Sequence, residues 1–208
     1  MNSSLDRNPV ILIHGIWDTK TIFNKMSAHL TQLGWCVHSL NLTPNDGSIG
    51  LDSLAQQLAD YISQTFDPKQ AIDIVGYSMG GLVSRYYVQR LGGIDRVQRF
   101  ITISSPHSGT LTAYSLPLPG YLDMRPNSGF LRDLHQDVTM LKRLNFTSIW
   151  TPFDVMILPS HSSKMSVGKE VKVNVLLHGQ MVTDIQSINA LVEELKAPIK
   201  NKIPVKNE

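Results

Sequence analysis

The chain has 208 residues, of which 42% are apolar and 17% are charged, and its formal net charge is +2. This balance is typical of a globular protein, and the length fits a single domain, residues 1–208, with a full hydrophobic core. The small net charge, without any run of Lys or Arg, argues against nucleic acid as a partner. Cys36 is the single cysteine, so an intrachain disulfide is excluded. The apolar surroundings of Cys36 predict a buried, unreactive thiol.

Neither a leader nor a membrane span is predicted. Residues 1–8 lack the basic and apolar regions of a secretory signal, and the chain holds no apolar run of about 18 residues. We therefore expect a cytoplasmic protein whose contact with a membrane, if it has one, is peripheral. The polar stretch 197–208 carries two prolines and is expected to fray. The sequence gives no indication of the oligomeric state.

Strand and helix patterns alternate along most of the chain. The first strand is a continuous run of apolar residues, which is typical of a strand buried on both faces of a parallel sheet. In chain order, the predicted strands cover residues 9–14, 35–40, 71–75, 97–104, 146–150 and 171–177. The predicted helices are five. The first covers residues 21–33, the second runs from residue 51 to a turn at 67–68, and the third runs from the turn at Ser78 to 92–93. The last two cover residues 130–144 and 185–195.

This alternation predicts an α/β domain with a mostly parallel six-stranded sheet flanked by helices. Residues 105–145 depart from the pattern, because prolines and many apolar residues occur there outside a regular strand or helix. A long connection with its own apolar content is often a functional cap or lid. Whether this segment is a mobile lid or a fixed cap is left open by the sequence.

The most informative stretch runs from Ile72 to Leu82, where an apolar strand enters Gly76-Tyr77-Ser78-Met79-Gly80 and a helical pattern follows. A G-x-S-x-G motif between a strand and a helix is the nucleophile elbow of serine hydrolases. Its glycines relieve crowding in a strained turn. The turn presents the Ser78 hydroxyl and places the Met79 N–H at a helix N-terminus, where an oxyanion is stabilised.

A serine nucleophile needs a base, and the base needs a carboxylate that orients it. Asp154 follows the strand 146–150 and His178 follows the strand 171–177, so both are expected at the same edge of the sheet as Ser78. The rival acid is Asp184, which is better placed as the N-cap of the last helix. Loop histidines His107 and His161 are the alternatives to His178, since each is expected near the same edge.

The loop after the first strand, His14-Gly15-Ile16-Trp17, is where the second half of an oxyanion hole is expected. Gly15 permits an unusual turn, after which the Ile16 N–H can join that of Met79. The simpler alternative is that His14-Gly15 is an ordinary glycine turn at the end of a strand, with no role in an oxyanion hole. The chain has no Cys/His cluster, H-E-x-x-H motif or glycine-rich phosphate loop, so no metal or cofactor is predicted.

Four segments carry a resemblance to a known family: Val10–Ile16, Asp73–Gly81, Ile101–Thr110 and Met124–Leu134. Together they resemble the α/β-hydrolase superfamily, and within it the small bacterial lipases and esterases, over residues 9 to 195. The resemblance implies an α/β-hydrolase fold and ester hydrolysis through an acyl-enzyme. It also implies Ser78, Asp154 and His178 as the triad, with the N–H groups of Ile16 and Met79 as the oxyanion hole.

The predicted function is therefore hydrolysis of carboxylic esters, with a lipid-like acyl ester favoured by the apolar content of residues 105–145. Acyl transfer and thioester cleavage on the same triad are the alternatives. A third alternative is a binding module without catalytic activity, but the intact set of candidate catalytic residues argues against it. Residues expected to line the substrate site are His14, Gly15, Trp17, Tyr77, His107, Leu116 and Leu118.

Overall fold

The computed structural model describes residues 7–200. The expectations for the leader, at residues 1–6, and for the end of the polar tail, at residues 201–208, lie outside the described residues. Among the described residues, no helix has both the length and the apolar character needed to cross a membrane.

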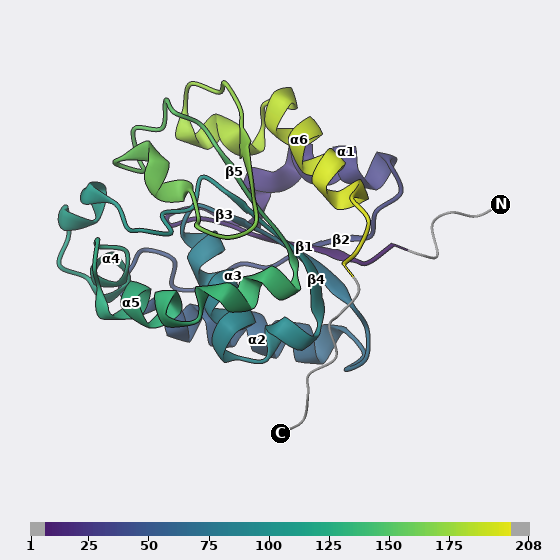
Figure 1. Cartoon of the computed structure of the whole chain (residues 1–208), viewed down its shortest axis with the longest axis horizontal. Helices are drawn as coiled ribbons and strands as arrows, with labels where there is room; N and C mark the ends of the chain where they lie inside the picture. The colour runs from purple at the N-terminus through teal and green to yellow at the C-terminus, as the bar shows by residue number, and fades with distance from the viewer. Residues whose placement is uncertain (1–6, 201–208) are drawn as a thin grey trace.

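The core of the molecule is a six-stranded sheet in which every pairing of neighbouring strands is parallel. The strand order is β2-β1-β3-β4-β5-β6, which places β3 and β4 at the centre, with β1 on the other side of β3 (Figure 1). The predicted sheet is thus confirmed. Its strands are β1 (Val10–Ile13), β2 (Val37–Ser39), β3 (Ile72–Tyr77), β4 (Val97–Ile103), β5 (Asn145–Trp150) and β6 (Lys169–Lys172).

Helices connect the strands and cover both faces of the sheet. The α-helices are α1 (Asn24–Gln32), α2 (Leu51–Thr65), α3 (Met79–Arg90), α4 (Pro119–Asp123), α5 (Gly129–Gln136) and α6 (Ile185–Lys196). Short 3-10 helices are η1 (Lys20–Phe23), η2 (Gly93–Asp95), η3 (Leu111–Tyr114), η4 (Val138–Arg143), η5 (Ser160–Ser163) and η6 (His178–Val182). In Figure 1, α1 and α6 lie on one side of the sheet, and α2 and α3 on the other.

Side chains of the central strands alternate between two apolar cores, one under each helix layer. On β1, Ile11 and Ile13 belong to the core under α2 and α3, whereas Val10 and Leu12 belong to the core under α1 and α6. Because both faces are covered, the strand is apolar at every position and wholly buried. The continuous apolar run that predicts a buried strand is explained by this two-sided packing.

Several predicted elements have different bounds in the structure. The helix expected over 21–33 is divided into η1 and α1, and the strand expected over 35–40 is reduced to β2. The helix expected over 130–144 is divided into α5 and the 3-10 helix η4, which meet at Asp137. The strand expected over 171–177 is instead β6, which starts earlier and ends at Lys172. It ends there because its neighbour β5 ends at Trp150, which pairs with Lys172. The chain from Val173 to Leu177 is therefore a loop that leads to His178.

The expectation of a buried Cys36 is wrong, because its side chain is exposed. Trp35 points into the core, and Cys36, the next residue, points away from it toward His38, whose Nε2 lies 3.3 Å from Sγ. This alternation is that of an extended edge segment, where neighbouring side chains point in opposite directions.

Candidate active site

Ser78 occupies the sharp turn between β3 and α3, with φ 53° and ψ −125°. A non-glycine residue with positive φ in this region is strained and persists only where the surrounding structure imposes it. Here the Ser78 N–H donates to the Ile103 carbonyl oxygen at 2.9 Å, which fixes the turn against β4. The serine side chain lies at the carboxyl edge of the sheet and faces a pocket.

The two glycines of the motif allow the backbone to pass close to its neighbours. A Cβ at Gly76 would lie 2.5 Å from the Gly81 Cα, and a Cβ at Gly80 would lie 2.5 Å from the His14 carbonyl oxygen. Both distances are far below a van der Waals contact, so a larger residue would displace the backbone. The motif therefore needs glycine at these positions for steric reasons.

His178 and Asp154 complete a line of hydrogen bonds with Ser78. Asp154 Oδ2 lies 2.7 Å from His178 Nδ1, and His178 Nε2 lies 3.0 Å from Ser78 Oγ. An ionised carboxylate only accepts hydrogen bonds, so His178 Nδ1 carries the proton and donates it to Asp154. Nε2 is then the acceptor for the Ser78 hydroxyl. The three residues that the sequence singled out are thus brought together in the geometry of a nucleophile, base and orienting acid.

Asp154 is 3% exposed and held by its own loop. Its Oδ1 accepts the N–H groups of Met156 and Ile157, each at 2.9 Å. Burial by itself raises the pKa of Asp154, but the hydrogen bond and charge of His178 and the two N–H donors outweigh it and lower the pKa below its ordinary value. The carboxylate is therefore ionised and oriented toward the imidazole.

The two N–H groups predicted to form an oxyanion hole, those of Met79 and Ile16, belong to segments that adjoin Ser78. Met79 is the first residue of α3, and the first N–H groups of a helix have no acceptor within it. In the part of the chain described, the N–H of Ile16 has no acceptor either, whereas that of Trp17 donates to Asn45. A methyl group built on Gly15 would lie 3.0 Å from Ser78 Cβ, so this loop passes directly over the serine.

His14 holds that loop from behind. Its Nε2 accepts the Leu42 N–H at 2.9 Å, so the proton is on Nδ1, which donates to the Gly15 carbonyl oxygen at 2.8 Å. Burial lowers the pKa of His14, which keeps the ring neutral and this tautomer in place. His14 is fully buried and does not line the pocket, so it positions the loop and makes no contact with a ligand.

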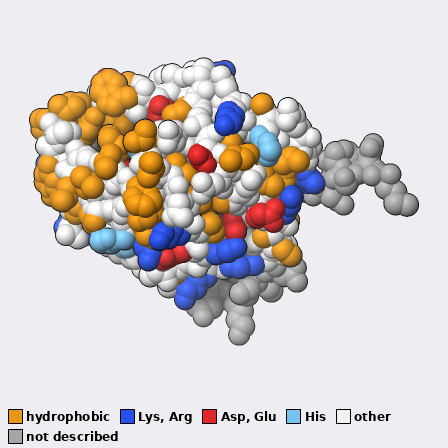
Figure 2. Space-filling view, turned by 90° about the horizontal axis from the view of Figure 1, so that it is seen from above, with side chains coloured by type: hydrophobic (Ala, Val, Ile, Leu, Met, Phe, Trp, Pro, Cys, Tyr) orange, Lys and Arg blue, Asp and Glu red, His pale blue; other side chains and the backbone are white. Residues whose placement is uncertain are grey.

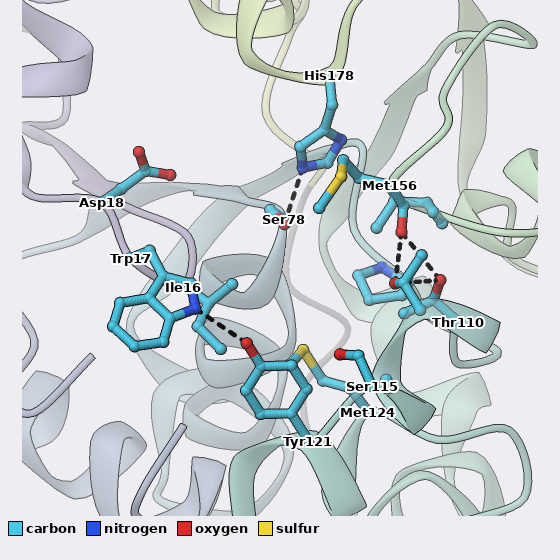
Figure 3. A pocket seen from close by; sticks show the side chains of 14 residues that line it. Ile16, Trp17, Asp18, Ser78, Thr110, Ser115, Tyr121, Met124, Met156 and His178 are labelled. Carbon is cyan, nitrogen blue, oxygen red and sulfur yellow. Dashed lines mark hydrogen bonds between the residues drawn. The ribbon is translucent and has the colours of Figure 1, made fainter. Parts of the chain in front are cut away.

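A cavity of about 340 Å³ opens above Ser78 and His178 (Figure 3). Its walls come from the loop after β1, from the 105–145 segment and from the loop after β5. Thr110 and Thr112 have their hydroxyl groups bonded to the Met156 carbonyl oxygen, at 3.0 and 2.7 Å, so these walls offer few free polar groups. The apolar lining residues are Ile16, Trp17, Pro106, Ala113, Met124, Met156 and Ile157.

Trp17 and Tyr121 join the two sides of the cavity. The Trp17 indole Nε1 donates to the Tyr121 hydroxyl at 2.9 Å, which links the loop after β1 to α4 (Figure 3). The Trp17 side chain is nevertheless 63% exposed, so one part of it forms the rim. This residue was expected at the site from its place next to Ile16, and it does line the cavity.

Other residues expected at the substrate site lie elsewhere. Tyr77 is buried under the α1 and α6 layer, and its hydroxyl donates to the His178 carbonyl oxygen at 3.1 Å. His107 is fully buried beneath the cavity, with Nε2 2.9 Å from the Thr102 hydroxyl, and burial holds its pKa well below the ordinary value. Leu116, which is exposed, and Leu118, which is half-buried, precede α4 and do not line the cavity.

The rival acid and base are not part of the site. Asp184 accepts the Gln186 N–H at 2.8 Å and is the N-cap of α6, as the sequence predicts. His161 is exposed on η5 and does not line the cavity. His178 is therefore the histidine that the fold brings to Ser78.

Several lining residues were not identified from the sequence as site residues. For Met156 and Ile157, the sequence signal that could have identified them is their position in the loop that carries Asp154. Asp18 likewise follows Trp17 immediately and lies in the cavity wall. Thr110 and Met124 are joined by a hydrogen bond between their backbones, which no local pattern predicts.

The model of the palmitoyl protein thioesterase family matches residues 9–128 of the chain. Among curated proteins, palmitoyl-protein thioesterase 3 of Dictyostelium discoideum is 24% identical over 149 residues, which cover 68% of this chain and 48% of that protein. A triacylglycerol lipase of Pseudarthrobacter phenanthrenivorans is 30% identical over 112 residues, which cover 50% of this chain and 34% of the lipase. The chain thus spans half or less of the length of the curated relatives it matches.

Solved structures of lipases share the fold. Aspergillus fumigatus lipase B superposes with a TM-score of 0.76 at 16% identity and covers 97% of this chain, which matches 55% of that lipase. The mature form of Bacillus licheniformis lipase BlEst2 gives a TM-score of 0.71 at 13% identity, over 91% of this chain and 92% of the lipase. At these identities the similarity establishes the α/β-hydrolase fold.

Proposed function

The chain belongs to the palmitoyl protein thioesterase family, and from this we propose that it is a serine hydrolase that cleaves acyl esters through an acyl-enzyme intermediate. The observation that carries the proposal is the line of hydrogen bonds from Asp154 through His178 to Ser78, at 2.7 and 3.0 Å. These three side chains come from three distant parts of the sequence. A strained serine, a neutral imidazole acceptor and an ionised carboxylate together have the roles needed for acyl transfer.

In the proposed first step, Ser78 Oγ attacks the carbonyl carbon of the ester while His178 Nε2 takes the hydroxyl proton. Asp154 keeps Nδ1 protonated and stabilises the imidazolium that forms. The carbonyl π electrons move to oxygen, and the N–H groups of Ile16 and Met79 stabilise the resulting oxyanion. A donor of this kind contributes about 3 kcal/mol to transition-state stabilisation in comparable sites.

The intermediate then collapses. The bond between the acyl carbon and the leaving oxygen breaks, and His178 gives its proton to the departing alcohol. Water follows, with His178 again as base, and releases the carboxylic acid from Ser78. If an alcohol takes the place of water, the same residues perform acyl transfer, which is the chemically adjacent alternative.

We propose that the apolar part of the cavity holds the acyl chain. Its volume falls within the range of small-molecule sites, and the hydroxyl groups of Thr110 and Thr112 are already occupied by the Met156 carbonyl oxygen. A hydrocarbon chain entering it would lose no hydrogen bond, whereas a polar group would find few partners there. A lipid-like acyl group therefore suits this wall better than a polar one.

The 105–145 segment is proposed to act as a fixed cap and not as a mobile lid. Arg90 donates to Asp133 Oδ2 at 2.8 Å and to Asp137 Oδ2 at 2.6 Å, which ties α3 to α5 and to the residue that follows α5. The buried Arg85 guanidinium donates to the Leu134 carbonyl oxygen at 2.7 Å. Opening the segment would break the Arg90 ion pairs and would take the Leu134 carbonyl oxygen away from Arg85, whose side chain is fully buried. A buried guanidinium that loses a hydrogen-bond acceptor is costly.

Contact with a lipid surface is proposed for the rim of the cavity. Figure 2 shows hydrophobic side chains gathered at the end of the molecule where Figure 1 places α4. The cap and the acid loop expose several large apolar side chains: Leu111, Tyr114, Leu122, Phe153 and Val155. A contiguous apolar patch beside a site is typical of such contacts. The cytoplasmic location stays a prediction.

Thioester cleavage is the second candidate, since the family model and the Dictyostelium relative are both described as palmitoyl thioesterases. Ser78, His178 and Asp154 would have the same roles. The one difference is that a thiolate is a better leaving group than an alkoxide, so its departure depends less on a proton from His178. Nothing in the cavity discriminates between the oxygen and sulfur atoms of a leaving group.

The proposal is tested by hydrolysis of p-nitrophenyl esters of increasing chain length, together with an acyl thioester of the same chains. We expect turnover by the wild type, loss of turnover in Ser78→Ala, and a preference for chains longer than acetyl. Ser108→Ala, an exposed serine outside the cavity lining, is the matched control and should keep full activity. Equal activity of the wild type and Ser78→Ala would contradict the proposal.

A further inference from the structure

Asp18 places a carboxylate in the wall of a mainly apolar cavity. Among the lining residues it is the only acid, and it lies beside the nucleophile. A methyl group built on Gly15 would be 3.2 Å from Asp18 Oδ2 and 3.5 Å from Ser78 Oγ, so both oxygens border the same small space. A ligand group bound to one of them is therefore close to the other.

The Asp18 carboxylate has no partner of its own. Its backbone is fixed, because the Asn45 side-chain amide donates to the Asp18 carbonyl oxygen. Within the described residues, however, no donor or cation pairs with the carboxylate oxygens. Burial raises the pKa of Asp18, and the nearby His14 and His178 rings oppose that rise. A half-buried acid that is held in place and unpaired would gain by binding a donor or a cation from a ligand.

Asp18 also lies on a particular side of the nucleophile. Figure 3 shows the Asp18 carboxylate on one side of Ser78 and His178, with Thr110 and Met156 on the other. Ile16 and Trp17 adjoin Asp18 and are apolar, so its carboxylate is the one acidic group on that side. On the side with Thr110 and Met156 the Thr110 hydroxyl is already bonded to the Met156 carbonyl oxygen at 3.0 Å, and this side is suited to the acyl chain. The opposite side is left for the leaving group, which must approach His178 to receive its proton.

The geometry points to Asp18 as the residue that selects the leaving group of the substrate by charge. The favoured substrates are acyl esters whose alcohol carries a cation or a hydrogen-bond donor, and those with an anionic leaving group are disfavoured. This inference rests on the proposed hydrolase function and adds the chemical class of the leaving group to it. Asp18 acts on the bound substrate and takes no part in the proton transfers between Ser78 and His178.

Three butyrate esters that differ in the charge of the alcohol test this directly. Butyrylcholine carries a cation, 3,3-dimethylbutyl butyrate is its neutral isostere, and the butyryl ester of 3-hydroxypropanoate carries an anion. At about pH 8, well above the carboxyl range, Asp18 is ionised. A charge a few ångströms away, at a partly exposed site, should change kcat/KM by about fivefold in each direction.

We expect the wild type to prefer the cationic over the neutral ester, and the neutral over the anionic ester, by about fivefold at each step. Asp18→Asn should bring both ratios close to one, and Asp18→Glu should restore them. The matched control is Asp60→Asn on the exposed face of α2, which makes the same change in net charge far from the cavity and should leave the ratios unchanged. A merely structural role of Asp18 would change the rates without changing the ratios.

The two hypotheses fail in different ways. If the wild type hydrolyses the neutral ester but its ratios are the same in Asp18→Asn, the leaving-group inference is wrong and the hydrolase proposal stands. If the wild type hydrolyses none of the three esters and none of the longer-chain esters, the proposed function itself is contradicted, and this inference with it.

Discussion

Replacing Asp154 by Asn isolates the contribution of its charge to the site. The Asn carbonyl oxygen can still accept the N–H groups of Met156 and Ile157, which now bind Oδ1 at 2.9 Å, so the loop should keep its shape. The Asn NH₂ group would then face His178 Nδ1, where Asp154 Oδ2 now accepts a hydrogen bond at 2.7 Å. An amide donor at this position favours the tautomer with the proton on Nε2, which cannot accept the Ser78 proton.

The expected decrease in kcat of Asp154→Asn has two contributions, the lost charge and the wrong tautomer. The carboxylate and the imidazolium are about 4 Å apart between their charge centres, and at an effective dielectric constant of about 20 their attraction is about 4 kcal/mol. That corresponds to about a 10³-fold effect on kcat. Because Asp154 is buried, this figure needs no reduction for solvent exposure. The wrong tautomer adds to the loss, and the total expected decrease in kcat is about 10⁴-fold, as in other triads.

The assay is kcat on a short-chain p-nitrophenyl ester, with the thermal midpoint of unfolding measured alongside. Asp184→Asn is the matched control, since Asn caps a helix as well as Asp does, and both its activity and its stability should be retained. A decrease in kcat of less than tenfold in folded Asp154→Asn would refute the role given to Asp154. An equal decrease in Asp184→Asn would refute the choice of acid.

Three further outcomes are expected. Gly80→Ala should lower the free energy of unfolding by about 2–3 kcal/mol, because its Cβ would lie 2.5 Å from a backbone carbonyl oxygen. Gly179→Ala, which has open space around it, should leave the free energy of unfolding unchanged, and thermal denaturation compares the two variants. His178→Ala should abolish ester turnover, and His161→Ala, on the exposed η5, should retain it in the same assay. The lowered pKa of Asp154 stabilises the fold above the unfolded carboxyl pKa of about 4, and this contribution is lost as the pH falls through the folded pKa. Urea titrations at decreasing pH should therefore show the wild type losing stability relative to Asp154→Asn, and parallel losses would contradict this.

The features that depend on local sequence could be predicted. The nucleophile turn is one, because strand, Gly76, Ser78, Gly80 and helix are contiguous and each is required by the backbone path. The order of strands and helices is another, since an apolar run such as 10–13 can only be buried between two layers. The N-cap role of Asp184 follows from the residues that come directly after it.

Features that depend on contacts between distant segments could not be predicted in the same way. The run from Val171 to Leu177 is apolar enough for a strand, but its length is decided by where β5 ends. Val173 and Val175 do pack into the core, while Leu176 and Leu177 are exposed in the loop that carries His178. The apolar pattern alone cannot distinguish core packing from pairing with a neighbouring strand.

The cavity wall was also beyond sequence reasoning. Leu116 and Leu118 are as apolar as Met124, yet of the three only Met124 lines the cavity. A backbone hydrogen bond from the Thr110 N–H to the Met124 carbonyl oxygen, at 2.9 Å, holds Met124 next to another lining residue. Likewise His107 directly follows Pro106, which lines the cavity, but its own side chain is fully buried and does not line it. Which side of a cap segment faces inward is set by its contacts with other parts of the chain.

The central claim is that Ser78 is the nucleophile, and covalent labelling tests it most directly. The protein is treated with a fluorophosphonate probe, which reacts with an activated serine, and the modified peptide is located by mass spectrometry. We predict one adduct, on Ser78, that is absent in Ser78→Ala and forms far more slowly in Asp154→Asn. Failure of the folded wild-type protein to react, or an adduct that persists in Ser78→Ala, would contradict it.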